Sequence, residues 1–202
     1  MAPYRIFLLS PAHCGGKRAE LLFNHHAAFP LALRLRSAPG VSLGEAFSFL
    51  SGLYFRGKLA YADRFARPPG GSPGVQVITT DRGLVSAAIQ VGIDDLRRFG
   101  AVDISADEPG YRIPLARDVA QLSCVADAEV VLLGSVATGK YVDILLEALG
   151  DRLLFPAEFV GRGDMSRGAL LLQAVRDGTE LSYQPVAGAV RRGRRAPKVR
   201  SG

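Results

Sequence analysis

Short runs of apolar residues, bounded by glycine, proline or polar residues, recur along the chain and predict β-strands. These runs are YRIFLL at 4–9, VQVITT at 75–80, AEVVLLG at 128–134, RLLFP at 152–156 and, with a weaker pattern, ELSYQPV at 180–186. Polar residues do not alternate with apolar ones within the stronger runs. Strands of that kind are buried on both faces of a sheet.

Segments with a helical spacing of apolar residues lie between the predicted strands. The longest covers 42–66 and places its apolar residues along one side. Ser42 and Glu45 form the S-x-x-E pattern of a capping box at its start. Gly52 and Gly57 are placed to bend or break it. Further helices are predicted at 92–100, 117–126, 139–150 and 166–178.

Helices that alternate with uniformly apolar strands predict an α/β domain. We expect a three-layer α/β/α sandwich with a short, mainly parallel central sheet. Ligands in such folds bind at the carboxyl ends of the strands. The segments that follow the predicted strands, 10–18, 79–85, 134–141 and 156–168, are all rich in glycine and polar residues. The sequence therefore predicts a binding site where these segments meet.

The positive charge of the chain is concentrated at its C-terminal end. The chain holds 25 Lys/Arg and 19 Asp/Glu, and six of the basic residues lie in RRGRRAPKVR at 191–200, which leaves 19 basic residues to balance the 19 acids. A length of 202 residues suits one domain. We expect a single α/β domain at 1–188 and a flexible basic tail at 189–202. The tail either binds nucleic-acid phosphates without sequence preference or only improves solubility.

No apolar run reaches the roughly 18 residues that a membrane span needs. The apolar core IFLL near the N-terminus is too short for a signal peptide, so we expect a cytoplasmic protein without membrane contact. Cys14 and Cys124 are far apart, which favours free thiols in that compartment. His13 beside Cys14 is a candidate metal-binding pair or nucleophile, but a loop thiol is the favoured interpretation. We expect neither a metal nor a cofactor.

The segment GSVATGK at 134–140 matches most of a phosphate-binding P-loop, G-x-x-x-x-G-K, between a predicted strand and a predicted helix. Tyr141 stands where such a loop needs Ser or Thr to bind magnesium. About 60 residues follow, which is little for the rest of a nucleotide hydrolase. We therefore favour a tight strand-to-helix turn in which Lys140 contacts a single phosphate.

Two carboxylates in the first half of the chain are candidate catalytic acids. Asp81 follows a predicted strand, where it can act as a general base or hold a ribose, and a turn aspartate that bonds its own backbone is the alternative. Glu45 can face a pocket, although the capping role alone is sufficient to explain it.

The segment LYFRGK offers an aromatic ring and two cations close together. Tyr54 is a candidate platform for stacking a base, and Arg56 and Lys58 are candidates for holding a phosphate. A plain amphipathic helix is the competing interpretation.

The stretch FVGRGDMSRG at 159–168 combines glycine and charge at the start of a predicted helix. Its glycines permit close approach of a ligand, and its arginines suit bidentate contacts with phosphate. The predicted anion-binding residues are Gly161, Arg162, Gly163, Ser166 and Arg167. Ser166 or Asp164 is expected to cap the helix, whose first N–H groups attract anions. A purely structural glycine loop is the alternative.

Three of these segments, VVLLGSVATGKYVDILLEAL, LLFP and FVGRGDMSRGALLL, resemble the C-terminal part of the uracil-DNA glycosylase superfamily. In that superfamily a strand ending in Leu-Gly runs into a helix, the next strand ends in His-Pro-Ser, and a loop Gly-x-x-His-Phe-Ser opens the last helix. Phe155, Pro156 and Ala157 fall on His-Pro-Ser. The second motif is matched by Gly161, Asp164, Met165 and Ser166. SPAHCGGKRA and the 53–85 block also resemble uncharacterised bacterial domains thought to share this fold.

The resemblance implies a uracil-DNA-glycosylase-like fold and a nucleic-acid-directed N-glycosidic hydrolase that acts on a modified or damaged base, in DNA rather than RNA. Such enzymes flip a nucleotide out of the duplex and stack its base on an aromatic ring, here Tyr54. Phe155 replaces the catalytic histidine, and SPAHCGG holds no water-activating acid. The acid would then be Asp81, Glu45 or Asp164. The alternative is a non-catalytic module that binds nucleic acid or a nucleotide.

Overall fold

The computed structural model describes residues 3–137 and 139–190. The basic segment at 191–200, and with it the predicted function of the tail, lies outside the described residues. A six-stranded sheet forms the centre of the molecule, with the strand order β4-β3-β1-β6-β7-β8. The strands are β1 (Tyr4–Leu9), β3 (Val75–Ile78), β4 (Leu84–Val85), β6 (Ala128–Leu133), β7 (Leu153–Pro156) and β8 (Tyr183–Pro185).

The four inner strands β3, β1, β6 and β7 are parallel, and the two edge strands run antiparallel to their neighbours. The prediction of an α/β fold with a mainly parallel sheet is therefore confirmed. The central strand β1 is buried from Ile6 to Leu9, as its unbroken apolar sequence requires.

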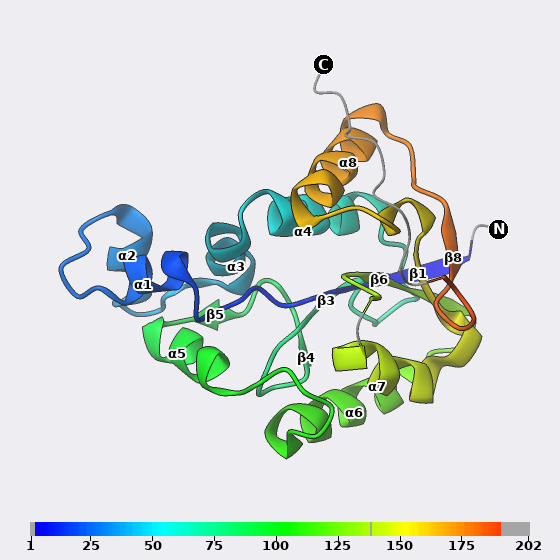
Figure 1. The fold of residues 1–202 in the computed structure, drawn as a ribbon, viewed down its shortest axis with the longest axis horizontal. Helices are drawn as coiled ribbons and strands as arrows, with labels where there is room; N and C mark the ends of the chain where they lie inside the picture. The colour runs from blue at the N-terminus through cyan, green and yellow to red at the C-terminus, as the bar shows by residue number, and fades with distance from the viewer. Residues whose placement is uncertain (1–2, 138, 191–202) are drawn as a thin grey trace.

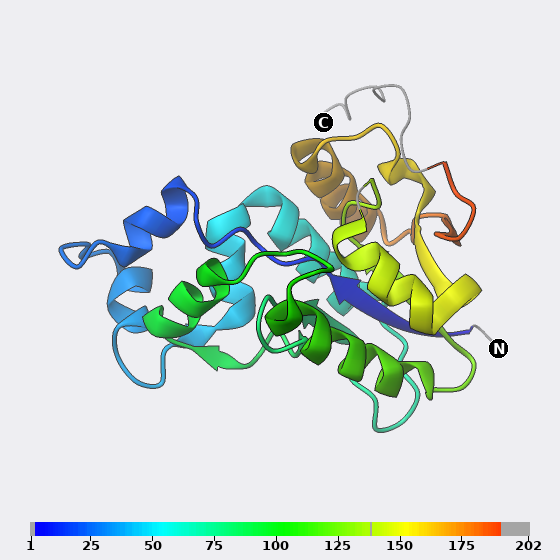
Figure 2. The same ribbon diagram turned by 60° about the horizontal axis from the view of Figure 1, so that its bottom comes forward.

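Helices cover both faces of the sheet (Figures 1 and 2). On one face lie α3 (Leu43–Ser51), α4 (Leu53–Phe65) and α8 (Asp164–Asp177), and on the other lie α6 (Pro109–Ser123) and α7 (Gly139–Leu149). Beyond the carboxyl ends of the strands lie α1 (Lys17–Phe23), α2 (Pro30–Leu35), α5 (Ile93–Ala101) and the small sheet of β2 (Val41–Ser42) and β5 (Gln90–Val91). Two short 3₁₀ helices, Gly150–Arg152 and Ala157–Phe159, flank β7.

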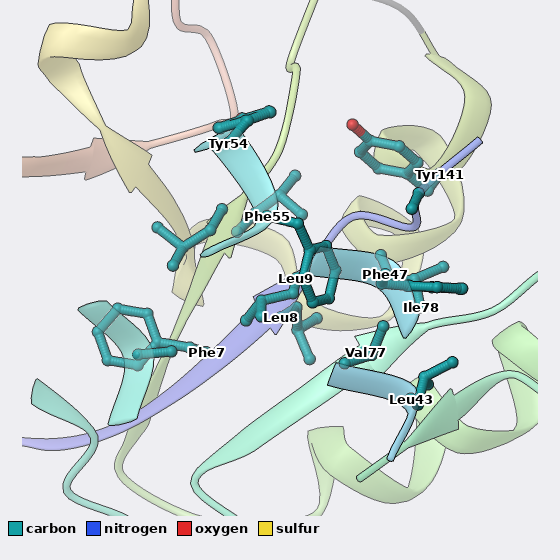
Figure 3. Close-up of a cluster of buried hydrophobic side chains, with 14 of the residues drawn as sticks. Phe7, Leu8, Leu9, Leu43, Phe47, Tyr54, Phe55, Val77, Ile78 and Tyr141 are labelled. Atoms are coloured by element: carbon teal, nitrogen blue, oxygen red, sulfur yellow. The ribbon is translucent and has the colours of Figure 1, made fainter. Parts of the chain in front are cut away.

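Aromatic residues of α3 and α4 pack on the strands to form the core. Phe47 and Phe55 meet edge to face, with ring centroids 5.3 Å apart. Figure 3 shows them above Leu8 and Val77, with Tyr54 and Tyr141 toward the margin of the same cluster. The core therefore reaches the carboxyl end of β1, where a binding site is predicted.

The segment predicted as one helix at 42–66 is divided into α3 and α4 at Gly52. Gly52 has φ of +60°, a conformation that favours glycine, and a Cβ atom there would lie 2.4 Å from the Arg18 guanidinium. Gly57 does not interrupt α4. Instead it faces Gly168 of α8, and a Cβ atom on Gly57 would lie 2.8 Å from the Gly168 carbonyl oxygen. These two glycines let α4 and α8 approach closely.

The capping of two helices differs from the sequence-based expectation. Ser42 Oγ accepts a hydrogen bond from the Glu45 backbone N–H at 3.2 Å, but the Glu45 carboxylate pairs with Arg34, so only half of the capping box forms. The last helix begins at Asp164 with Gly163 as its N-cap, so the prediction that Ser166 or Asp164 caps it was wrong. Because Gly163 has an extended backbone, the helix starts directly after it.

The sequence also misplaced α6 and missed α1 and α2. Helix α6 begins eight residues before the predicted start at 117. Pro109 occupies its first turn, and Pro114 lies inside the helix. Proline is compatible with the first turn of a helix, where its missing N–H is not needed.

Candidate functional site

The candidate site lies where the chain leaves the sheet in opposite directions. From β1 the chain proceeds to β3 on one side, and from β6 it proceeds to β7 on the other. The loops that follow β1 and β6 therefore diverge, and ligands in open α/β sheets bind in the crevice that this leaves. A pocket of about 320 Å³ occupies that position. Its walls include Ser10, Tyr54, Lys58, Lys140, Tyr141 and Asp164.

Lys58 of α4 is the most unusual residue of this pocket, because its side chain is only 1% exposed. Its Nζ atom donates hydrogen bonds to the carbonyl oxygen of Ser10 at 2.6 Å and to Ser10 Oγ at 2.9 Å. Nζ also lies 4.7 Å from the ring centroid of Tyr54 and 4.8 Å from that of Phe55. Within the described residues, no carboxylate forms an ion pair with this amine.

Burial lowers the pKa of Lys58 to about 7, because water no longer stabilises its charged form. The carboxylate of Asp164 acts in the opposite direction, and the charge of Arg167 adds to the decrease. An amine with that pKa is partly neutral at physiological pH, unlike an exposed lysine.

The hydroxyl of Tyr141, from α7, lies close to Ser10 beside Gly134 at the end of β6. A Cβ atom on Gly134 would lie 2.8 Å from the Tyr141 hydroxyl and 2.9 Å from Ser10 Cβ, so only glycine leaves room for both side chains. The Tyr141 hydroxyl donates to the Ser135 carbonyl oxygen at 2.9 Å. Burial raises the pKa of Tyr141, and hydrogen bonding to Ser10 and Ser135 opposes the rise. The residue that departs from the P-loop pattern is therefore a wall of the pocket, and exposed Lys140 stands beside it.

Tyr54 lines the pocket from α4 but is only 5% exposed. Its ring meets Phe159 edge to face at 6.3 Å. Its hydroxyl is buried without a hydrogen bond of good geometry. Burial raises the pKa of this hydroxyl, although the nearby Arg167 guanidinium opposes the rise. The hydroxyl is thus a polar group that lacks a partner beside the pocket.

Asp164 reaches the pocket from the first turn of α8, and its side chain is 70% exposed. The guanidinium of Arg167 lies 3.6 Å from one Asp164 oxygen, and it donates to the Phe159 carbonyl oxygen at 3.2 and 3.3 Å. Because Arg167 is only 9% exposed, it holds the loop before α8 rather than reaching into solvent.

The other residues of the predicted anion-binding loop are explained by the structure of the loop itself. Arg162 donates to the Glu158 carbonyl oxygen at 2.9 Å and to Ser166 Oγ at 3.1 Å. Gly161 has φ of +72°, which explains a glycine at that turn. A Cβ atom on Gly163 would meet nothing within 4 Å, so space for a ligand does not require this glycine.

The structure does not bring the other two candidate acids to this pocket. Glu45 binds Arg34 through both carboxylate oxygens at 2.7 and 2.9 Å, and it lines a separate hollow of about 840 Å³ together with Arg56. Asp81 lies 3.6 Å from Arg82 Nε, and its Oδ1 atom is buried without a hydrogen bond. The larger hollow is lined by residues of α1, α2, α3, α4 and α8 and holds no buried charge, so we place the candidate site at the strand ends.

Cys14 is buried and its thiol donates to the Ala12 carbonyl oxygen. Burial raises the pKa of Cys14 to about 12, which opposes formation of the nucleophilic thiolate. In the part of the chain that the structure describes, no cluster of three His, Cys, Asp or Glu residues could hold a metal ion. Among the same residues no helix is long and apolar enough to cross a membrane.

Two residues of the pocket, Ser10 and Tyr141, were not among the sequence candidates, and Lys58 was considered only as a phosphate-binding cation. A signal for Lys58 exists, because it lies four residues after Tyr54 and therefore on the apolar side of the helix. No comparable pattern marks Ser10. Neither a protein-family model, nor a curated protein, nor a solved structure matches this chain.

Proposed function

We propose that the pocket between β1 and β6 is the active site of a nucleic-acid-directed N-glycosidic hydrolase with a uracil-DNA-glycosylase-like fold. The observation that carries the proposal is the meeting of Tyr54, Lys140 and Asp164, from three different helices, around one pocket. These residues represent the aromatic, phosphate-binding and acidic candidates of the sequence. Their convergence at the carboxyl ends of the central strands supports a shared function.

Asp164 is the candidate that suits the acid–base step best. Its carboxylate can accept a proton from an attacking water or stabilise an oxocarbenium-like sugar. Phe155, on the superfamily's histidine position, is fully buried and does not line the pocket. The chemistry must therefore come from other side chains, and Asp164 is the only one of the three candidate acids on this pocket wall.

The pocket is also suited to the rest of a nucleotide. Lys140 is exposed at the wall and can attract a phosphate, and Tyr54 lines the pocket with a buried hydroxyl that has no hydrogen bond. The basic segment at 191–200 would add affinity for the nucleic-acid backbone that does not depend on sequence. We propose a modified or damaged base in DNA as the substrate.

A non-catalytic module that binds nucleic acid or a nucleotide is the second candidate. One observation favours it: the Asp164 side chain is 70% exposed, whereas acids tuned for catalysis are commonly desolvated. A binding protein needs only the shape and charge of the pocket.

The two candidates are separated by incubating the full chain with duplexes that each carry one modified base, and then cleaving abasic sites with alkali. The hydrolase proposal predicts strand breaks at the modified base for at least one duplex. It also predicts that Asp164→Asn abolishes the breaks, while Glu45→Gln, on the other hollow, retains them. Tight binding of the duplexes with no break across the panel would overturn the hydrolase and support the binding module.

A further inference from the structure

The amine of Lys58 is buried in a way that favours its neutral form. Moving a charged ammonium out of water is unfavourable even after the protein relaxes around it. Contacts with the ring faces of Tyr54 and Phe55 offset only part of this cost. No carboxylate of the described residues pairs with Nζ to offset the remainder. The surroundings of Lys58 are therefore those of an amine that loses its proton easily.

Counting hydrogen bonds leads to the same conclusion. A neutral amine has two N–H groups and one lone pair, and Nζ has two oxygen acceptors in reach, both on Ser10. A charged ammonium has three N–H groups, and among the described residues no oxygen accepts from the third. The two Ser10 oxygens thus satisfy the neutral amine completely and leave its lone pair without a partner.

The position of this lone pair matters because Lys58 lines the pocket together with Ser10 and Tyr54. The two hydrogen bonds to Ser10 hold Nζ in place, so it does not move freely like the amine of an exposed lysine. A desolvated, positioned lysine amine is the kind of nucleophile that forms Schiff bases with carbonyl compounds.

We propose that Lys58 is an amine nucleophile that forms a Schiff base with the C1′ aldehyde of an abasic deoxyribose held in this pocket. The reactivity of the amine is inferred from its own contacts. The identity of the sugar rests on the proposed function, because removal of a base from DNA leaves this aldehyde in the open-chain form of the sugar.

The reaction balances without an oxidant or reductant. The Nζ lone pair attacks the C1′ carbonyl carbon, a C–N bond forms, and the C=O π electrons move to oxygen to give a carbinolamine. A proton passes from nitrogen to that oxygen, water leaves, and a C=N bond remains. Borohydride, when added, delivers hydride to the C1′ carbon, and a proton from solvent completes a stable secondary amine.

The test is reductive trapping of the full chain on a duplex with one preformed abasic site, with borohydride as the reductant. The proposal predicts a covalent protein–DNA complex in which mass spectrometry of peptides locates the added mass on Lys58. Because this mapping is made on the unaltered protein, it does not depend on the folding of any variant.

Two variants sharpen the result. Lys58→Arg keeps a cation of similar reach, yet its guanidinium stays protonated and cannot attack, so trapping falls by about tenfold or more. Lys17→Met removes an exposed lysine of α1, outside the pocket, and leaves the adduct on Lys58. Trapping on Lys140, Lys17 or Lys198, persistence of the complex in Lys58→Arg, or absence of any complex would each overturn the proposal.

The outcomes for the two proposals are independent, because the abasic duplex needs no base removal. Base release from a modified duplex without trapping on abasic DNA would retain the hydrolase and refute the role of Lys58. Trapping on Lys58 without base release from any duplex would retain the role of Lys58 and refute the hydrolase.

Discussion

The ε-amino group of Lys58 lies 2.9 Å from Oγ of Ser10 and 2.6 Å from the carbonyl oxygen of the same residue. This pair joins α4 to the carboxyl end of the central strand. It also places a buried amine, with no carboxylate partner in the described chain, on the wall of the pocket that Asp164 enters from α8.

Lys58→Met changes how stability depends on pH. The pKa of Lys58 is about 7 in the folded protein and 10.5 as an ordinary lysine, so between these values the unfolded chain binds more protons. The free energy of unfolding of the wild type therefore gains up to about 1.4 kcal/mol per pH unit from this group as the pH rises from 7 to 10.5. Below pH 7 the full cost of the buried charge remains.

The measurement is urea unfolding of wild type and Lys58→Met at several pH values from 7 to 9. Asp164, Arg167 and the hydroxyls of Tyr54 and Tyr141 surround Lys58 and are present in both proteins, so the difference between the two slopes isolates the lysine. We expect the wild type to gain stability relative to the variant as the pH increases. Parallel slopes would show that Lys58 stays charged.

Gly168→Ala tests the close approach of α4 and α8. A Cβ atom there would lie 2.9 Å from the backbone of Leu53 and Tyr54. We expect a loss of about 1–3 kcal/mol in the free energy of unfolding, as for other overpacked cores, although alanine is the better helix former. Gly70→Ala is the control, because a Cβ atom there meets nothing within 4 Å. Equal thermal unfolding midpoints for the two variants would contradict this packing.

Alkylation distinguishes the two cysteines. Cys14 is buried with its pKa raised to about 12, whereas Cys124 is exposed. Iodoacetamide at pH 8 should modify Cys124 in the folded protein and reach Cys14 only after denaturation, because the thiolate is the reactive form. Peptide mass spectrometry gives the extent at each site. Rapid modification of Cys14 in the folded protein would restore it as a candidate nucleophile.

The strands β1, β3, β6, β7 and β8 and the break at Gly52 could be predicted from the sequence, because apolar runs and a glycine within a helical pattern have direct local causes. The two-residue strands β2, β4 and β5 were not predicted. Tyr54, Lys140 and Asp164 were also recognised as candidates. Ser10 was not, since a serine after a strand resembles any other loop residue. Its importance comes from Lys58, which lies 48 residues away.

Side-chain direction explains the remaining differences at the site. Glu45 and Asp81 occupy positions that suit an acid, but the first turns toward Arg34 and the second toward Arg82. Arg167 was expected to hold a ligand anion, and it lies inward against the Phe159 carbonyl oxygen. Tertiary packing decides these directions, and spacing along the chain does not encode them.

The placement of the active site is tested most directly by single-turnover base release from the modified duplex that the wild type cleaves fastest. Three variants are compared, each of which replaces one carboxylate by the corresponding amide. Asp164→Asn should lower the rate by about 100-fold or more, the usual contribution of a general acid or base. Asp81→Asn and Glu45→Gln, which alter carboxylates outside the pocket, should leave the rate close to that of the wild type. Full activity in Asp164→Asn, with loss of activity in either of the other two, would contradict the placement of the active site between β1 and β6.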